Sequence, residues 1–179
     1  MTTDREARFA ALFRRHHAAV RRYVTRRAWP DAVDDVVAET FLTAWRRFDA
    51  LPPDPLPWLL GTARRCLSNH RRSALRGAAL LDRLRAQPAG AAAEEQARGA
   101  QRDSLLRAFA RLSDAERELV MLTEWDGLQP RRVAAVIGVT APEARARIYR
   151  ARRKLRRALD EELGRPAAVP ITRSIHDTA

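Results

Sequence analysis

The sequence predicts an all-α protein built of two small helical domains joined by a flexible linker. Apolar residues recur at spacings of three and four along most of the chain, which is the period of an amphipathic helix. Only 7 of the 179 residues are glycine, and no alternating apolar pattern bounded by hairpin turns stands out. Residues 77–101 are rich in alanine, glycine, arginine and glutamate, so they cannot form a core of their own and are the predicted linker.

The first two helices are predicted from their apolar stripes. The stripe of the first helix consists of Phe9, Leu12, Phe13, Val20, Tyr23 and Val24. Trp29-Pro30 ends this helix, and Asp31 is expected to cap the next one. The second helix, residues 32–48, buries Val33, Val36, Val37, Phe41, Ala44 and Phe48. Its outer face carries Asp34, Asp35 and Glu39, which is notable in a basic protein.

A proline-rich segment follows the second helix. Residues 49–57 contain four prolines, which lack amide donors and restrict the residues before them. We therefore expect a stiff loop here, with a third helix starting at Trp58 and ending in the basic run 69–72.

The second domain starts near Leu105. Ser113 and Glu116 have the spacing of a capping box ahead of an apolar run. Residues 129–157 then divide into a short helix, a tight Gly138-Val139-Thr140 turn and a longer basic helix, which is the layout of a helix-turn-helix.

The longer basic helix has two different faces. Its core face is predicted to consist of Ala144, Ile148, Ala151 and Leu155. The opposite face carries or adjoins Pro142, Glu143, Arg145, Ala146, Arg147, Tyr149, Arg150 and Arg153. Small residues flanked by Arg and Glu suit base edges, where Arg reads guanine and Glu accepts from cytosine. The alternative is a solvated basic helix at the end of a bundle.

The overall composition favours a polyanionic partner or an acidic protein surface. Lys and Arg number 34 against 22 acidic residues, a net charge of +12. Lys154 is the only lysine, and all other basic residues are arginine. A GC-rich genome also produces this arginine bias, so the placement of the charges, and not their number, has to show whether they bind a polyanion. Cys66 is the single cysteine, and no apolar run has the length of a signal peptide or a membrane span, so we expect a cytoplasmic protein.

No catalytic constellation is recognisable. His16, His17, His70 and His176 lack ligand spacing with acids, and no P-loop or Rossmann glycines occur. We therefore expect no enzymatic activity, no metal and no cofactor.

Four segments together resemble a known family. Residues 34–46, 57–64, 112–120 and 147–155 resemble, in this order, the conserved regions of sigma-70 family RNA polymerase sigma factors of the extracytoplasmic-function (ECF) type. The resemblance implies a sigma-2 domain at 1–76 and a helix-turn-helix sigma-4 domain at 102–163. The linker predicted from composition lies between them at 77–101, and the tail at 164–179, which contains Pro166 and Pro170, is expected to be disordered.

The resemblance also implies site residues. For binding to core RNA polymerase they are Asp35, Ala38, Glu39, Phe41, Leu42 and Trp45. For the minus-10 element of promoter DNA they are Leu51, Pro57, Trp58, Arg64, Arg65, Asn69, Arg71 and Arg72. For the minus-35 element they are Arg131, Arg132, Glu143, Arg145, Ala146, Arg147, Tyr149, Arg150 and Arg153.

Several of these roles have structural alternatives. Phe41 and Trp45 can be core residues, and for Trp58 packing at a helix start is favoured over base contact. Arg131 and Arg132 suit phosphate contacts and solvated positions equally. Arg65 and Glu143 depart from the residues common in the family, so the base preference is not carried over.

The predicted partners are core RNA polymerase, promoter DNA and an anti-sigma factor. The linker predicts that the two domains of the free protein change their relative position, as in a mobile dumbbell. The alternative function is a helix-turn-helix regulator that binds its operator without polymerase, and a more remote one is a nucleic-acid-modifying enzyme. The acidic face of residues 34–45 favours the sigma factor.

Overall fold

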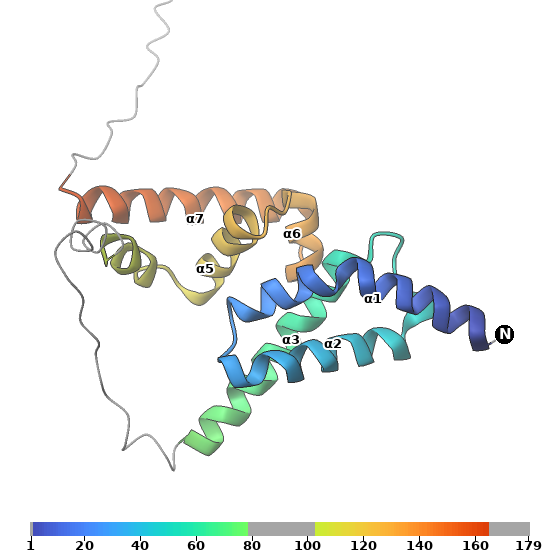
Figure 1. Cartoon of the computed structure of the whole chain (residues 1–179). Coiled ribbons are helices and arrows are strands. Elements are labelled where there is room, and N and C mark those ends of the chain that lie inside the picture. The colour runs from blue at the N-terminus through green and yellow to red at the C-terminus, as the bar shows by residue number, and fades with distance from the viewer. Residues whose placement is uncertain (1, 79–102, 165–179) are drawn as a thin grey trace, which may run out of the picture. The chain divides into compact units, whose positions relative to one another are not determined.

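A computed structural model of the chain describes residues 2–78 and 103–164, and within these ranges every regular element is helical (Figure 1). The prediction of an all-α fold is confirmed. Most of the predicted linker and the tail beyond Gly164 lie outside the described residues. The chain divides into two compact units, Met1–Pro88 with Leu122–Arg145, and Ala89–Met121 with Ala146–Ala179. The predicted domain boundaries stay a prediction.

Two long helices open the first unit. Helix α1 (Thr2–Thr25) buries Val20, Tyr23 and Val24 near its C-terminal end. A 3-10 turn, η1 (Pro30–Ala32), leads directly into α2 (Val33–Arg46). The expectation that Asp31 caps α2 is wrong, because Ala32 is the cap residue and makes no side-chain cap bond. Pro30 starts the 3-10 turn and draws Asp31 into it, so Asp31 is one position too early.

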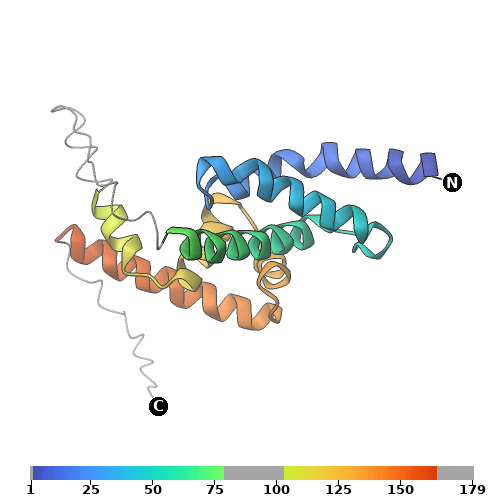
Figure 2. The same cartoon turned by 90° about the horizontal axis from the view of Figure 1, so that it is seen from below.

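Helix α2 packs against α1 and against α3, and all three lie close together in both views (Figures 1 and 2). Its predicted stripe is buried, apart from Phe48, which is half-buried and lies in a separate turn, η2 (Phe48–Ala50). Thr40 is the one polar residue in the buried part of α2, and its hydroxyl donates to the Val36 carbonyl at 2.7 Å. A buried hydroxyl with such a partner avoids the penalty of an unsatisfied polar group.

Helix α3 (Pro55–Ala78) starts earlier than expected. Pro55 and Pro57 lie in its first turn instead of a loop. The amides of the first helical turn have no partner within the helix, so proline loses nothing there and its fixed φ suits the helix. The proline-rich loop is correspondingly short, and the helix continues past the basic run 69–72.

The C-terminal half begins with a helix at 103–110, followed by α5 (Asp114–Val120) and a π-helical stretch, η3 (Met121–Trp125). The capping box at the start of α5 is confirmed. The Ser113 amide donates to the Glu116 carboxylate at 2.8 Å, and the Glu116 amide donates to the Ser113 hydroxyl at 3.3 Å.

The helix-turn-helix is also confirmed. Helix α6 (Pro130–Ile137) ends at Gly138, whose φ of 75° is left-handed and favours glycine. Helix α7 (Ala141–Glu162) then begins, and the Glu143 amide donates to the Thr140 hydroxyl at 3.4 Å. In the second compact unit, Arg107 on the helix at 103–110 donates to Glu162 near the end of α7 at 2.6 Å.

Candidate nucleic-acid and polymerase interfaces

Helix α7 has a buried face and an exposed basic face. Ala144, Ile148 and Ala151 are buried, and Leu155 is half-buried, as the sequence predicted. All predicted minus-35 positions on this helix are exposed, namely Glu143, Arg145, Ala146, Arg147, Tyr149, Arg150 and Arg153. Tyr149 is 66% exposed, which is high for an aromatic side chain. The face is therefore accessible and can enter a DNA groove without any rearrangement of α7.

Helix α6 contributes two further arginines to the candidate DNA surface. Arg131 and Arg132 are both exposed near its N-terminal end. The Arg132 guanidinium donates to the Asp54 carboxylate at 2.9 Å. Arg132 is thus paired within the chain, and it could reach a phosphate only after leaving Asp54.

The outer face of α2 is accessible at four of the six predicted polymerase-binding positions. Asp35, Ala38, Glu39 and Leu42 are exposed. Phe41 is only 4% exposed and packs edge-on against Phe13 with ring centroids 4.7 Å apart. Phe41 is therefore a core residue, because its position on α2 turns it toward α1.

Trp45 is half-buried under the start of α1. The Arg5 guanidinium lies 4.2 Å from the centre of the Trp45 ring, and it also donates to the Trp45 carbonyl at 2.8 Å. Phe9 meets the same ring edge-on at 5.0 Å. Trp45 therefore anchors the N-terminal end of α1, and only part of its side chain remains for a partner.

The acidic face of α2 also influences its surroundings. Glu39 pairs with His70 of α3 at 3.4 Å. Burial raises the pKa of the Cys66 thiol, and the neighbouring Glu39 carboxylate raises it further. Cys66 is consequently held as an unreactive thiol, and its role is packing between α2 and α3.

The predicted minus-10 residues differ in accessibility. Arg64, Arg65 and Asn69 of α3 are exposed, and Arg65 donates to the Thr62 hydroxyl at 3.0 Å. Leu51 and Trp58 are half-buried, whereas Pro57 is buried and does not offer a surface in this arrangement. Arg71 and Arg72 lie on α3, but their side chains are outside the described residues.

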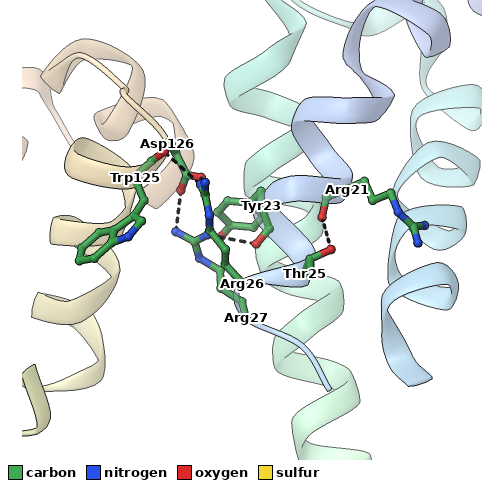
Figure 3. A network of polar contacts seen from close by, with 7 residues as sticks. All are labelled: Arg21, Tyr23, Thr25, Arg26, Arg27, Trp125 and Asp126. Atoms are coloured by element: carbon green, nitrogen blue, oxygen red, sulfur yellow. Dashed lines mark hydrogen bonds and ion pairs between the residues drawn. The ribbon is translucent and has the colours of Figure 1, made fainter. Parts of the chain in front are cut away.

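Sequence reasoning missed a cluster that the fold brings together. Arg26 and Arg27, directly after the end of α1, both bind Asp126, which follows η3 about a hundred residues later (Figure 3). No local sequence pattern predicts a contact between residues so far apart in the chain. Two signals could have drawn attention to the region: Gly61 inside an otherwise helical run, which suggests a close approach, and the Asp126-Gly127 turn.

The described residues contain neither a candidate metal site nor a candidate membrane span. Residues 4–70 and 103–164 contain no group of three or more His, Cys, Asp or Glu side chains placed to hold a metal ion. Within the described part of the chain, no helix is long and apolar enough to cross a bilayer.

A helix-turn-helix with a basic face on its last helix is typical of DNA-binding proteins. The acidic face of α2 suits a protein partner. Together they indicate the class of DNA-binding proteins that also bind another protein. Family models agree with this class. Residues 12–77 match the model described as sigma-70 region 2, and residues 102–155 match the model described as sigma-70 region 4.

Known proteins similar to the chain carry related names. CnrH of Cupriavidus metallidurans, an RNA polymerase sigma factor, is 33% identical over 86% of the chain and 87% of CnrH. SigL of Mycobacterium tuberculosis, an ECF RNA polymerase sigma factor, is 28% identical over 84% of the chain and 88% of SigL. RfaY of Xanthomonas campestris, described as a probable RNA polymerase sigma factor, is 32% identical over 72% of the chain, and the match spans 34% of RfaY.

A solved structure extends the likeness to the fold. CnrH in complex with the cytosolic domain of CnrY has a TM-score of 0.58 and 28% identity, covering 87% of the chain and 90% of the matched chain. The chain therefore belongs to the sigma-70 family of RNA polymerase sigma factors, in its ECF group, whose members are promoter-specificity subunits.

Proposed function

We propose that the chain binds core RNA polymerase through the exposed acidic face of α2, the minus-10 element through α3 and the loop before it, and the minus-35 element through α7. The single observation that carries this assignment is the division of charge between two exposed surfaces. Helix α2 exposes Asp35 and Glu39, whereas α7 exposes a row of arginines. An acidic face repels DNA phosphates and complements a basic protein surface, whereas a basic helix of a helix-turn-helix fits the major groove.

Base reading by α7 is assigned to its first turns. Arg145 and Arg150 are exposed there, next to the small side chain of Ala146. A small residue lets the helix approach the base edges, and Arg can then bind guanine with two hydrogen bonds. Arg131 of α6 is better suited to a phosphate because helices that precede the reading helix cross the DNA backbone.

The proposed partners follow from these surfaces. They are core RNA polymerase, promoter DNA and an inhibitory anti-sigma protein, and the work with polymerase takes place in the cytoplasm. The similar protein CnrH was solved with the cytosolic domain of a second protein, CnrY, which supports a protein partner besides polymerase for this chain. No cofactor enters the proposed function.

A footprint separates this function from that of a self-sufficient regulator. A promoter is first mapped from the RNA 5′ ends that appear when the chain is overexpressed. The chain with core polymerase should protect the minus-10 and minus-35 elements, and the chain alone should protect neither. Protection by the chain alone at the same concentration would instead identify a regulator that acts without polymerase.

A further inference from the structure

The turn between α1 and α2 exposes a tryptophan that the core does not use. Trp29 is 73% exposed, which makes it the most exposed of the four tryptophans in the chain. Both sides of the turn are packed, because Val24 of α1 and Val33 of α2 are buried. A tryptophan side chain that becomes fully buried removes about 150–250 Å² from water. The turn therefore presents a large apolar ring to solvent at a point where both adjoining helices are anchored in the core.

The backbone of the turn holds Trp29 in a fixed position. The Ala28 amide donates to the Val24 carbonyl at 2.9 Å, which closes the end of α1. Pro30 follows directly and restricts Trp29 to extended backbone, with φ at −67° and ψ at 148°. The Trp29 carbonyl accepts from the Ala32 amide at 3.0 Å. A ring on such a backbone loses little freedom on binding, because only its two side-chain torsions remain to be ordered.

Trp29 directly precedes the acidic face of α2. The 3-10 turn η1 follows it and leads into α2, whose first turn carries Asp34 and Asp35 (Figure 1). Leu42 lies on the same outer face, about 10 Å beyond Asp35 along the helix axis, and it is 48% exposed. The acidic part of this face, which also contains Glu39, is thus bounded by an exposed apolar side chain at each end, Trp29 before it and Leu42 after it.

The charges close to Trp29 favour a protein partner over DNA. Residues 21–29 contain four arginines, and three of them are bound to carboxylates of the chain, namely Arg21, Arg26 and Arg27. The exposed carboxylates of the acidic face repel DNA phosphates, whereas they attract a basic protein surface. An exposed aromatic ring beside exposed acids is therefore suited to a partner that is both basic and apolar.

We propose that Trp29 is a hydrophobic anchor of the contact with core RNA polymerase, in which the ring enters an apolar pocket next to the basic surface that meets Asp35 and Glu39. The inference rests on the proposed function, and it adds a residue outside the polymerase-binding positions that the family resemblance implies. A few tryptophan, tyrosine or arginine side chains typically supply most of the binding energy of an interface. Here the acids of α2 attract and orient the partner, and the ring supplies the apolar burial that slows dissociation.

Kinetics with the full-length chain and immobilised core polymerase separate the ring from the acidic face. Trp29→Ala should raise the dissociation rate at least about tenfold and leave the association rate unchanged, because it removes buried apolar area and no charge. Trp29→Phe should have a smaller effect, since an aromatic ring remains. Leu163→Ala is the control, because Leu163 is exposed and lies in no proposed interface. Circular dichroism of these variants should match that of the wild type, since both side chains are exposed.

A chemical measurement locates the ring independently of affinity. Cys66 is the single natural cysteine and is buried with a raised pKa, so Trp29→Cys introduces the only readily reactive thiol. When nine tenths of this variant are bound to core polymerase, its alkylation by iodoacetamide should slow about tenfold, because only the free tenth reacts. Ala18→Cys, at an exposed position of α1, is the control and should react equally fast with and without polymerase.

The outcomes distinguish the anchor from its alternatives. An unchanged dissociation rate of Trp29→Ala would overturn the proposal, and so would faster dissociation without protection of the thiol at position 29. Normal binding to core polymerase combined with weaker promoter complexes would place the ring on DNA and also overturn it. Unchanged binding of Asp35→Arg combined with Glu39→Arg would refute the proposed polymerase face instead, and the thiol at position 29 would still report whether the turn touches polymerase.

Discussion

At the scale of single residues, the position of the charges is more informative than their number. Arginines are in excess throughout the chain, yet α2 keeps Asp35 and Glu39 on its outer face. The fold exposes both carboxylates, whereas it turns the intervening Val36 and Val37 into the core. Two neighbouring carboxylates on one helix attract a basic protein surface and disfavour DNA, so these two residues carry the proposed contact with polymerase.

Reversing both charges should therefore abolish the contact with polymerase. Asp35→Arg combined with Glu39→Arg is expected to eliminate co-purification with core polymerase, while circular dichroism stays unchanged because both side chains are exposed. A control with the same change in net charge is Asp4→Arg combined with Asp31→Arg, at exposed positions outside this face. Retained co-purification of the Asp35 and Glu39 double variant would remove the face from the interface.

Two arginines of the helix-turn-helix should differ in their effect on promoter choice. Arg150→Ala should relax the preference at one or two promoter positions, because a bidentate contact contributes about 1 to 3 kcal/mol of discrimination. Arg131→Ala should weaken all promoters alike and lower the salt dependence of binding by about one counterion. Binding is measured with holoenzyme on a set of single-base promoter variants. A uniform loss in both variants would show that Arg150 does not read bases.

At the scale of elements, the start of α5 depends on two side chains. The capping box places Ser113 and Glu116 in reciprocal contact, and Lys154 of α7 donates to the Glu116 carboxylate at 2.7 Å. Ser113→Ala should lower the free energy of unfolding by about 1 kcal/mol, since one helix-terminal amide loses its acceptor. Urea unfolding followed at the helical signal measures this change. An unchanged midpoint would mean that water replaces the hydroxyl at no cost.

The same carboxylate should make stability depend on pH. The hydrogen bond from Lys154, followed by that from the Ser113 amide, holds the pKa of Glu116 below its usual range. A lowered pKa in the folded state stabilises the fold above the ordinary carboxylate pKa, and this stabilisation is lost as the pH falls through the folded-state value. The melting temperature of Glu116→Gln should therefore fall less on acidification than that of the wild type. Asp31→Asn, at an exposed acid, is the control.

At the scale of the whole molecule, an inhibitor that binds both proposed domains should bind the intact chain much more tightly than either part. Once one domain is bound, the tether makes the second contact intramolecular, and effective concentration then strengthens binding. Titrating an anti-sigma partner encoded near the gene against the full chain and against fragments 1–76 and 102–179 measures the difference. One fragment that reproduces the full affinity would show that the inhibitor does not need both domains.

Local chemistry explains what the sequence predicted well. The period of the apolar residues predicted α1, α2 and α7. The spacing of Ser113 and Glu116 predicted a capping box, whose hydrogen bonds join residues only three positions apart. Gly138 marked the turn of the helix-turn-helix because only a few residues accept a left-handed φ. The start of α3 was predicted at Trp58, but the helix begins at Pro55. This error has a local cause as well, because proline breaks a helix interior but suits the first turn.

The sequence by itself determined the helices, the helix-turn-helix and the exposed basic and acidic faces, because each of these depends on residues within a few positions of one another. Only the tertiary structure decided which aromatic side chains of α2 are buried and which distant charges meet. Phe41 is in the core because α1 covers it, and Arg27 meets Asp126 because the fold brings together residues 99 positions apart. Periodicity records which face of a helix is apolar, but the neighbour that covers this face is selected by packing across the whole chain.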